Sequence, residues 1–224
     1  MIAFISDIHG NFPALQAVLH EIDRMKCDQI ICLGDVTGYY SQVNECITLL
    51  RQRGIPCLLG NHDYYLISNG CCSSKTVKLC LDYQKTVISE DNLNWLRGNS
   101  PFADTAEFSL RHAGWHDAIE ERFDRFDFSW VDAMPQRAFF SGHTHVQGMC
   151  VNVSMDRVYC NPGSVGQPRD NDPRAAFAVW TGGCNKVSLH RVPYDINETV
   201  RHMQAAGLGD WIWKGLYTGR QIGK

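Results

Sequence analysis

The sequence has no long apolar run and no stretch rich in lysine and arginine. No segment is apolar over enough residues to span a bilayer, and residues 1–5 form neither a basic region nor a long hydrophobic one. We therefore expect a cytoplasmic protein with no membrane partner. The formal net charge of −3 excludes a protein that coats extended nucleic acid through a generally basic surface.

Paired CxxC spacings, internal repeats and evident linkers are also missing. The cysteines are scattered, and several lie in apolar segments, which predicts buried reduced thiols and not a disulfide framework: Cys32, Cys57, Cys150 and Cys160. The neighbours Cys71 and Cys72 are the exception, because they lie in a polar stretch that predicts an exposed loop.

The length and composition suit a single domain over residues 1–224, since a chain of 224 residues with 44% hydrophobic residues can bury a sizeable core. Residues 2–5, 29–33 and 57–59 are short apolar runs typical of strands buried on both faces. Residues 13–25 and 43–53 carry apolar residues at helical spacing, with Asn11 as the N-cap of the first helix. This β-α-β-α-β order predicts an α/β fold.

The later segments are predicted more coarsely. Residues 64–100 and 115–134 are expected to form helical or loop cap segments, and the charges of residues 115–134 predict a solvated helix face. Residues 107–112 predict a further strand. Residues 149–153, 158–160, 176–180 and 187–191 predict antiparallel strands of a second sheet, and residues 197–206 predict a terminal helix.

Polar side chains follow each of the first three predicted strands. A single Asp after a strand is usually a turn or cap residue. Three successive strands that end in carboxylate, amide and imidazole groups instead indicate a site at one edge of a sheet. These residues are Asp7 and His9, then Asp35, then Asn61, His62 and Asp63.

His143 and His145 follow the apolar run 138–140, with one residue between them. In a chain with nine histidines, such a pair taken alone is best interpreted as a surface turn with solvated imidazoles. The other strand-end residues change this interpretation, because a dinuclear site needs several oxygen and nitrogen ligands from separate segments.

Five ordered motifs resemble those of the calcineurin-like metallophosphoesterases, and essentially the whole chain is similar to the small bacterial and archaeal branch of that family. The motifs are Asp7-x-His9, Gly34-Asp35, Gly60-Asn61-His62-Asp63, His112 and Gly142-His143-x-His145, followed by Asn161-Pro162-Gly163-Ser164-Val165-Gly166. Within that branch the chain looks most like phosphatase-like proteins and dinucleoside tetraphosphate hydrolases. The resemblance implies a four-layer α/β/β/α sandwich of two mixed sheets.

The resemblance also implies the roles of individual residues. Asp7, His9 and His145 would hold one metal ion, Asn61, His112 and His143 a second, and Asp35 would bridge the two. His62 would act as the general acid, oriented by Asp63 in a carboxylate–histidine pair. The ligand set suits two divalent transition-metal ions, Mn, Fe or Zn, with Mn expected to support activity.

Two departures from the family pattern affect the expected site. Ala113 follows His112 where the family usually has glycine, which makes His116 a competing ligand candidate. The loop after Gly38 differs too, and we expect Tyr39 to contact substrate there. Arg169 is predicted to bind phosphate through its guanidinium group, with a surface salt bridge as the alternative.

The leading hypothesis is a dinuclear metal-dependent phosphoesterase acting on a small phosphorylated substrate, a dinucleoside polyphosphate or a phosphomonoester. A phosphodiesterase or nuclease acting on short or cyclic nucleotides is the alternative. A non-catalytic scaffold of the same fold is disfavoured, because such scaffolds tend to lose ligands that this chain retains. The sequence leaves the choice among monoester, diester and pyrophosphate open.

Overall fold

The computed structural model describes residues 1–68, 70 and 74–220. Cys71 and Cys72, with their predicted exposed loop, lie outside these residues. The helices are α1 (Phe12–Met25), α2 (Val43–Gln52), α3 (Asn61–Ser68), α4 (Lys75–Val87), α5 (Glu90–Arg97) and α6 (Ile196–Ala205). The strands are β1 (Ile2–Ile5), β2 (Gln29–Cys32), β3 (Phe102–Asp104), β4 (Phe108–Arg111), β5 (Ala138–Ser141), β6 (Gly148–Val151), β7 (Val158–Asn161), β8 (Ala175–Thr181) and β9 (Lys186–Val192).

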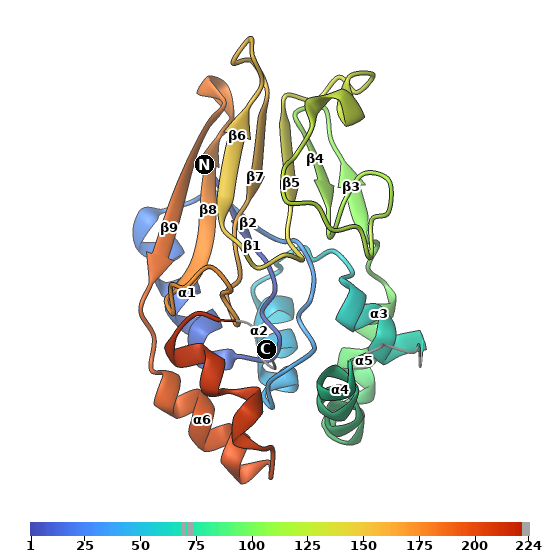
Figure 1. Ribbon diagram of the computed structural model, residues 1–224, viewed down its shortest axis with the longest axis vertical. Coiled ribbons are helices and arrows are strands. Elements are labelled where there is room, and N and C mark those ends of the chain that lie inside the picture. The colour runs from blue at the N-terminus through green and yellow to red at the C-terminus, as the bar shows by residue number, and fades with distance from the viewer. Residues whose placement is uncertain (69, 71–73, 221–224) are drawn as a thin grey trace.

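The strands form two mixed sheets that lie face to face (Figure 1). The first sheet has the order β2-β1-β8-β9, with β1 parallel to β2 and antiparallel to β8. The second has the order β3-β4-β5-β7-β6, in which β4, β5 and β7 are parallel and the two edge strands antiparallel. The predicted α/β fold with two mixed sheets is confirmed.

The strands alternate their side chains between separate apolar layers, as the pleat requires. Ala3 and Ile5 of β1 pack toward the helices, whereas Phe4 packs between the sheets. There the ring of Phe4 stacks on that of Phe140 at 3.9 Å. The strand is therefore buried on both faces, which explains its uninterrupted apolar sequence.

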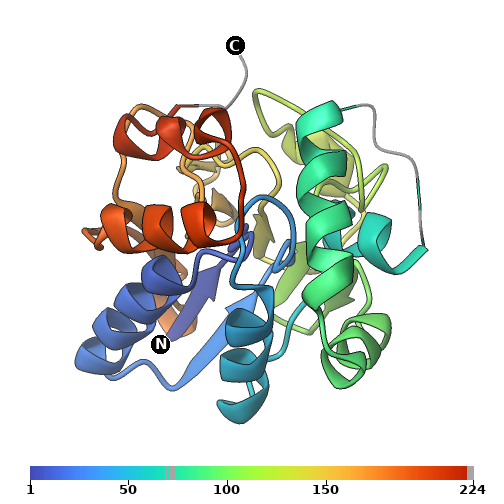
Figure 2. The ribbon, with the colours of Figure 1, turned by 90° about the horizontal axis from the view of Figure 1, so that it is seen from below.

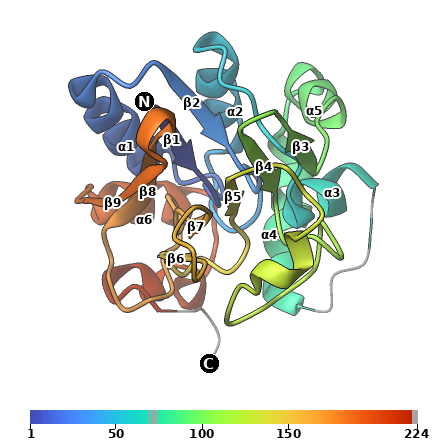
Figure 3. The same ribbon diagram turned by 90° about the horizontal axis from the view of Figure 1, so that it is seen from above.

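Helices α1, α2 and α6 pack on the outer face of the first sheet (Figures 2 and 3). The side chain of Asn11 caps α1, as predicted, by accepting a hydrogen bond from the backbone N–H of Ala14. Helices α3, α4 and α5 lie on the right of the same views, and α5 contacts α2. Ser74 and Ser89 cap α4 and α5 separately, so the predicted cap segment over residues 64–100 contains these two helices and the end of α3.

The outer face of the second sheet is covered by residues 115–134. The predicted helix face is wrong here, since this segment contains only the short 3-10 turn η1 (Phe128–Val131) and otherwise no helix. Its aromatic side chains explain the difference, because they pack onto the sheet: Phe126 stacks on Tyr159 of β7 at 4.2 Å. The fourth layer is thus an aromatic loop.

Two strand predictions are corrected by long-range pairing. Strands β8 and β9 join the first sheet beside β1 and not the second sheet with β6 and β7. Residues 57–59, predicted as a strand, form only an isolated parallel bridge between Cys57 and Cys32. Within the residues described, no disulfide joins any cysteines, and Cys32 and Cys160 are buried, whereas Cys57 and Cys150 are partly exposed.

Among the described helices, none is both long and apolar enough to cross a membrane.

Candidate metal centre

Five loops bring the predicted ligands together, four of them at strand ends. Asp7 and His9 follow β1, Asp35 follows β2, Asn61 begins α3, His112 follows β4, and His143 and His145 follow β5. Backbone hydrogen bonds join these loops, for example from the N–H of Asp7 to the carbonyl of Gly34 at 3.0 Å. All seven side chains are buried.

Five of the seven have a left-handed backbone, with φ values of 54° at Asp7, 53° at His9, 55° at Asp35, 66° at His143 and 62° at His145. For residues other than glycine this conformation costs about 1 kcal/mol each and persists only where the surroundings impose it. Hydrogen bonds do so here: the carboxylate of Asp7 accepts from the N–H of His143. No residue pattern predicts this conformation.

The first cluster consists of Asp7, His9, Asp35 and His145, whose ligand atoms lie within 4.8 Å of one another. The Nε2 atoms of His9 and His145 are 3.0 Å apart. Oδ1 of Asp7 is 3.3 Å from Nε2 of His145, and Oδ2 of Asp35 is 3.7 Å from Nε2 of His9. Two imidazoles and two carboxylates thus converge on one point.

The second cluster consists of Asp35, His112 and His143, also within 4.8 Å, and Asn61 adds an amide oxygen. Oδ1 of Asn61 lies 3.2 Å from Nε2 of His112 and 3.1 Å from Nδ1 of His143. Oδ2 of Asp35 is 3.6 Å from Nε2 of His112. Asp35 therefore belongs to both clusters, the position that the bridging role requires.

The second nitrogens of three histidines determine which atom faces the centre. Nδ1 of His9, His112 and His145 lies 2.7, 2.9 and 2.6 Å from the backbone carbonyls of Thr37, Leu33 and Gln167. A carbonyl only accepts, so each Nδ1 must carry the proton and donate, which leaves the Nε2 lone pair directed inward. Imidazole lone pairs and carboxylate oxygens directed at the same points fit cations. The residues present therefore fit two metal ions.

The pKa values of the buried carboxylates and imidazoles also favour the binding of positive charge. Burial, with the carboxylates of Asp63 and Asp7, raises the pKa of Asp35 well above its usual range. Burial also lowers the pKa of His145 to about 4 and that of His143 to about 2, so both imidazoles are neutral near pH 7. Neutral imidazoles supply no counter-charge to the buried carboxylates, whereas divalent cations would.

His62 lies beside the clusters, with its ring 4.7 Å from that of His9 and 5.0 Å from that of Tyr39. Its backbone N–H donates to Oδ1 of Asp35 at 2.9 Å, and its side chain is buried. Nδ1 has no hydrogen-bond partner among the described residues. Burial, followed by the charge of Arg169, lowers the pKa of His62 well below its usual value.

Asp63 contacts backbone and not the imidazole of His62. Its carboxylate accepts hydrogen bonds from the N–H groups of Val36, Thr37 and Gly60. In the part of the chain that the structure describes, the predicted carboxylate–histidine pair is not formed. Asp63 instead joins the loops after β2 and before α3, and so positions His62 through the backbone.

Arg169 and Tyr39 lie side by side at the first cluster. The guanidinium group of Arg169 donates to Oε1 of Gln167 at 2.6 Å and to the hydroxyl of Tyr39 at 3.0 Å. The ring of Tyr39 lies 4.8 Å from that of His9. The surface salt bridge considered for Arg169 is not observed among the described residues, since its partners are neutral.

The departure at Ala113 does not disturb the centre. Ala113 has no positive φ, so alanine is tolerated there, and His112 is buried in the second cluster. The ring of His116 is exposed and bonded to Glu121 at 2.8 Å, which removes it as a competing ligand.

Comparisons with known proteins agree with this geometry. Residues 1–182 match the calcineurin-like phosphoesterase superfamily domain. An uncharacterised protein of Methanocaldococcus jannaschii is 30% identical, over 98% of both chains. A symmetrical bis(5'-nucleosyl)-tetraphosphatase of Pasteurella multocida is 26% identical over 57% of this chain and 58% of its own.

Solved structures extend the likeness to three dimensions. A metallophosphoesterase from Sphaerobacter thermophilus is 30% identical with a TM-score of 0.85, over 97% of this chain and 98% of its own. A hypothetical protein from Pyrococcus horikoshii shares the fold at a TM-score of 0.86 and 20% identity, over 99% and 100%. Because sequence and fold agree over nearly the whole length, the chain belongs to the calcineurin-like phosphoesterase superfamily.

Proposed function

We propose that the protein is a dinuclear metal-dependent phosphoesterase that hydrolyses a small phosphorylated substrate. One observation carries the proposal: Asp35 belongs to both clusters, so two ions would share one carboxylate. When bound, such ions lower the pKa of a water molecule and neutralise charge on the phosphoryl oxygens. The mixed imidazole, carboxylate and amide ligands suit Mn, Fe or Zn, and we expect Mn²⁺ to support activity.

Residues around the clusters have separate tasks in this proposal. Arg169 binds a phosphoryl oxygen, since its planar group is already oriented by Gln167 and Tyr39. His62 protonates the leaving oxygen. A bound phosphate dianion beside His62 offsets the charge of Arg169, which favours the protonated imidazole that a general acid needs.

Dinucleoside polyphosphates and phosphomonoesters are the proposed substrate classes. The Pasteurella multocida tetraphosphatase supports the first, although it matches only 57% of this chain. A phosphodiesterase or nuclease acting on short or cyclic nucleotides is the second candidate, because a dinuclear centre also suits diesters. The retained ligand set and His62 disfavour a scaffold.

A panel of metals and substrates tests the proposal. Metal-free protein is loaded with Mn²⁺, Fe²⁺ or Zn²⁺ and assayed on an aryl monoester, an aryl diester, diadenosine tetraphosphate and a phosphopeptide. We expect Mn²⁺-dependent hydrolysis of at least one substrate. Protein with stoichiometric metal that hydrolyses none of them would contradict an enzymatic role.

The role of His62 is tested with His62→Ala, with the exposed His20→Ala as matched control. We expect kcat to fall by about 10²- to 10⁴-fold in His62→Ala for phenyl phosphate. The loss should be smaller for nitrophenyl phosphate, whose leaving group needs no proton. Equal losses on both substrates would show that His62 does not act as the acid.

A further inference from the structure

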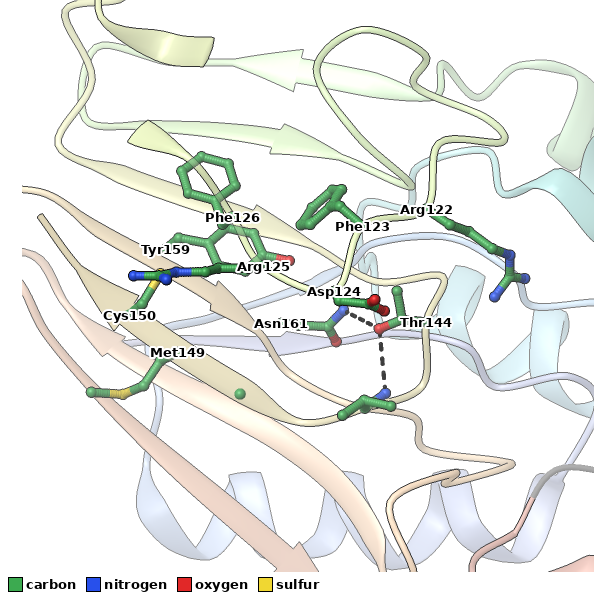
Figure 4. A pocket seen from close by; sticks show the side chains of 12 residues that line it. Arg122, Phe123, Asp124, Arg125, Phe126, Thr144, Met149, Cys150, Tyr159 and Asn161 are labelled. Carbon is green, nitrogen blue, oxygen red and sulfur yellow. Dashed lines mark hydrogen bonds between the residues drawn. The ribbon is translucent and has the colours of Figure 1, made fainter. Parts of the chain in front are cut away.

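A groove of about 490 Å³ runs between residues 122–126 and strands β6 and β7 (Figure 4). Pockets of 300–1,000 Å³ are typical for small-molecule ligands. One end is lined by Thr144, which stands between the ligands His143 and His145 in the sequence. The groove therefore begins at the loop that carries two metal ligands.

The groove is joined structurally to the metal centre. Nδ2 of Asn161 donates to the carbonyl of Gly142 at 2.7 Å and to Oγ1 of Thr144 at 3.0 Å, which ties the groove floor to the ligand loop. Arg122 lies at the same end of the groove as Thr144, whereas Met149 lies at the other (Figure 4).

The lining combines an aromatic wall with charged side chains of both signs. Phe123 is half-buried and packs edge-on against Trp130 at 5.2 Å, which holds its ring beside the groove. Arg122, Asp124 and Arg125 are exposed along the same wall. Aromatic faces stack on bases, guanidinium groups bind phosphate, and a carboxylate accepts hydrogen bonds from ribose hydroxyls. A phosphorylated sugar has no ring that could stack and would leave the aromatic wall unused.

We propose that this groove binds the nucleoside group of the substrate, so that the enzyme acts on nucleotide-containing phosphate esters or anhydrides. The inference rests on the proposed function, because the metal centre anchors the phosphate. Phe123 stacks on the base, Arg122 binds a phosphate outside the centre, and Asp124 accepts from the ribose. Stacking is tolerant of base identity, so the groove selects nucleotides as a class and not one base.

Inhibition constants of AMP and of ribose 5-phosphate, measured against aryl phosphate hydrolysis, test the groove. Ribose 5-phosphate carries a hydroxyl group at the position where AMP carries the base. We expect AMP to inhibit about tenfold more strongly in the wild type, because stacking of one base contributes a factor of this order. Equal inhibition constants would overturn the proposal.

Two variants locate the effect. Phe123→Ala removes the stacking surface, and Gly148→Trp fills the groove, since a Cβ at Gly148 would meet no atom within 4 Å. The preference for AMP should fall to less than about threefold in both, and persist in Phe128→Ala, an aromatic residue of the same segment outside this groove. A preference retained in Gly148→Trp would place the base elsewhere.

Binding measured without turnover separates this inference from the proposed function. Calorimetric titration of the protein with AMP and with ribose 5-phosphate reports the groove even if no substrate is hydrolysed. Tighter AMP binding by a protein inactive on the whole panel would retain the groove and reject the enzyme. If the protein hydrolyses a substrate but binds both molecules equally, the proposed activity stands and the proposed nucleoside-binding role of the groove is wrong.

Discussion

Nε2 of His9 lies 3.0 Å from Nε2 of His145, and the Nδ1 atoms of both rings donate to backbone carbonyls. Both facing nitrogens therefore carry lone pairs, which repel one another unless a cation or proton lies between them. The backbone carbonyls thus select the tautomer that binds metal.

His143 and His145 should bind different metal ions. His145→Ala removes a ligand of the first cluster and His143→Ala one of the second, so each variant should retain about one of two ions per chain. Metal analysis after dialysis checks the content, and spectra of cobalt-substituted protein identify the remaining site. His9→Ala should give the spectrum of His145→Ala. Equal loss from both sites in both variants would contradict the assignment.

The stability of the metal-free protein should fall with falling pH. The pKa of His145 is lowered to about 4 and that of His143 to about 2 from an unfolded value of 6.5. Below about pH 6.5 the unfolded chain binds more protons at these two histidines, so the stabilisation present above that pH is lost, at roughly 1.4 kcal/mol per pH unit for each group. The raised pKa of Asp35 acts in the opposite sense, but it is one group against two.

Urea unfolding of metal-free protein, measured about every half pH unit from about pH 4.5 to 7.5, gives the free energy of unfolding as a function of pH and checks its slope. His145→Gln, which cannot titrate, should lessen the slope. A free energy of unfolding that stays level over this range would show that the imidazoles are not neutral and buried.

Gly38 should tolerate no side chain. Its φ is +139°, and a Cβ there would lie 2.2 Å from Nδ1 of His9 and 2.8 Å from Nδ1 of His62. Gly38→Ala should therefore displace the predicted ligand His9 and the proposed general acid His62 together, and lower kcat/KM by about a hundredfold. Steady-state kinetics on an aryl phosphate measure this loss.

Gly54→Ala is the matched control, because Gly54 also has a positive φ of +60° but no atom within 4 Å of its Cβ position. We expect it to lose about 1 kcal/mol of stability while kcat/KM stays unchanged. Similar kcat/KM values for the two variants would show that the backbone at Gly38 moves away from His9 and His62 without affecting activity.

Arg169→Ala should raise the inhibition constant of inorganic phosphate by about tenfold, because one charged hydrogen-bonding group is lost. Tyr39→Phe should have a smaller effect, since it removes only one hydrogen bond that orients Arg169. Arg174→Ala is the control, as Arg174 is exposed and bonded to Asp172. Unchanged kinetics of Arg169→Ala on every accepted substrate would refute its role.

The convergence of the ligands could be predicted because it depends on local pattern. Asp7 and Asp35 follow parallel strands, and parallel strands deliver their carboxyl ends to the same edge. The assignment of β8 could not be predicted, since its pairing with β1 depends on contacts between residues far apart in sequence. The helix predicted for residues 115–134 is wrong because charges between aromatic residues resemble a solvated helix, whereas the aromatic side chains pack on the sheet.

The geometry within the site was less accessible from the sequence. No pattern of residue types indicates that Asp7 and His145 adopt a left-handed backbone, because tertiary hydrogen bonds impose it. The bonding of Asp63 to backbone N–H groups is equally a property of the assembled loops. The groove beside Phe123 depends on how a loop packs, which composition does not determine.

Strand β1 lies between β2 and β8, and this order has a consequence for biosynthesis. Residues 2–32 can form their parallel pair soon after they leave the ribosome, but the other edge of β1 pairs with residues near Trp180. The apolar strand β1 therefore keeps one edge unpaired until β8 has been synthesised. Nascent chains that stop before β8 should be captured by chaperones or aggregate, and the metal centre should form only late in synthesis.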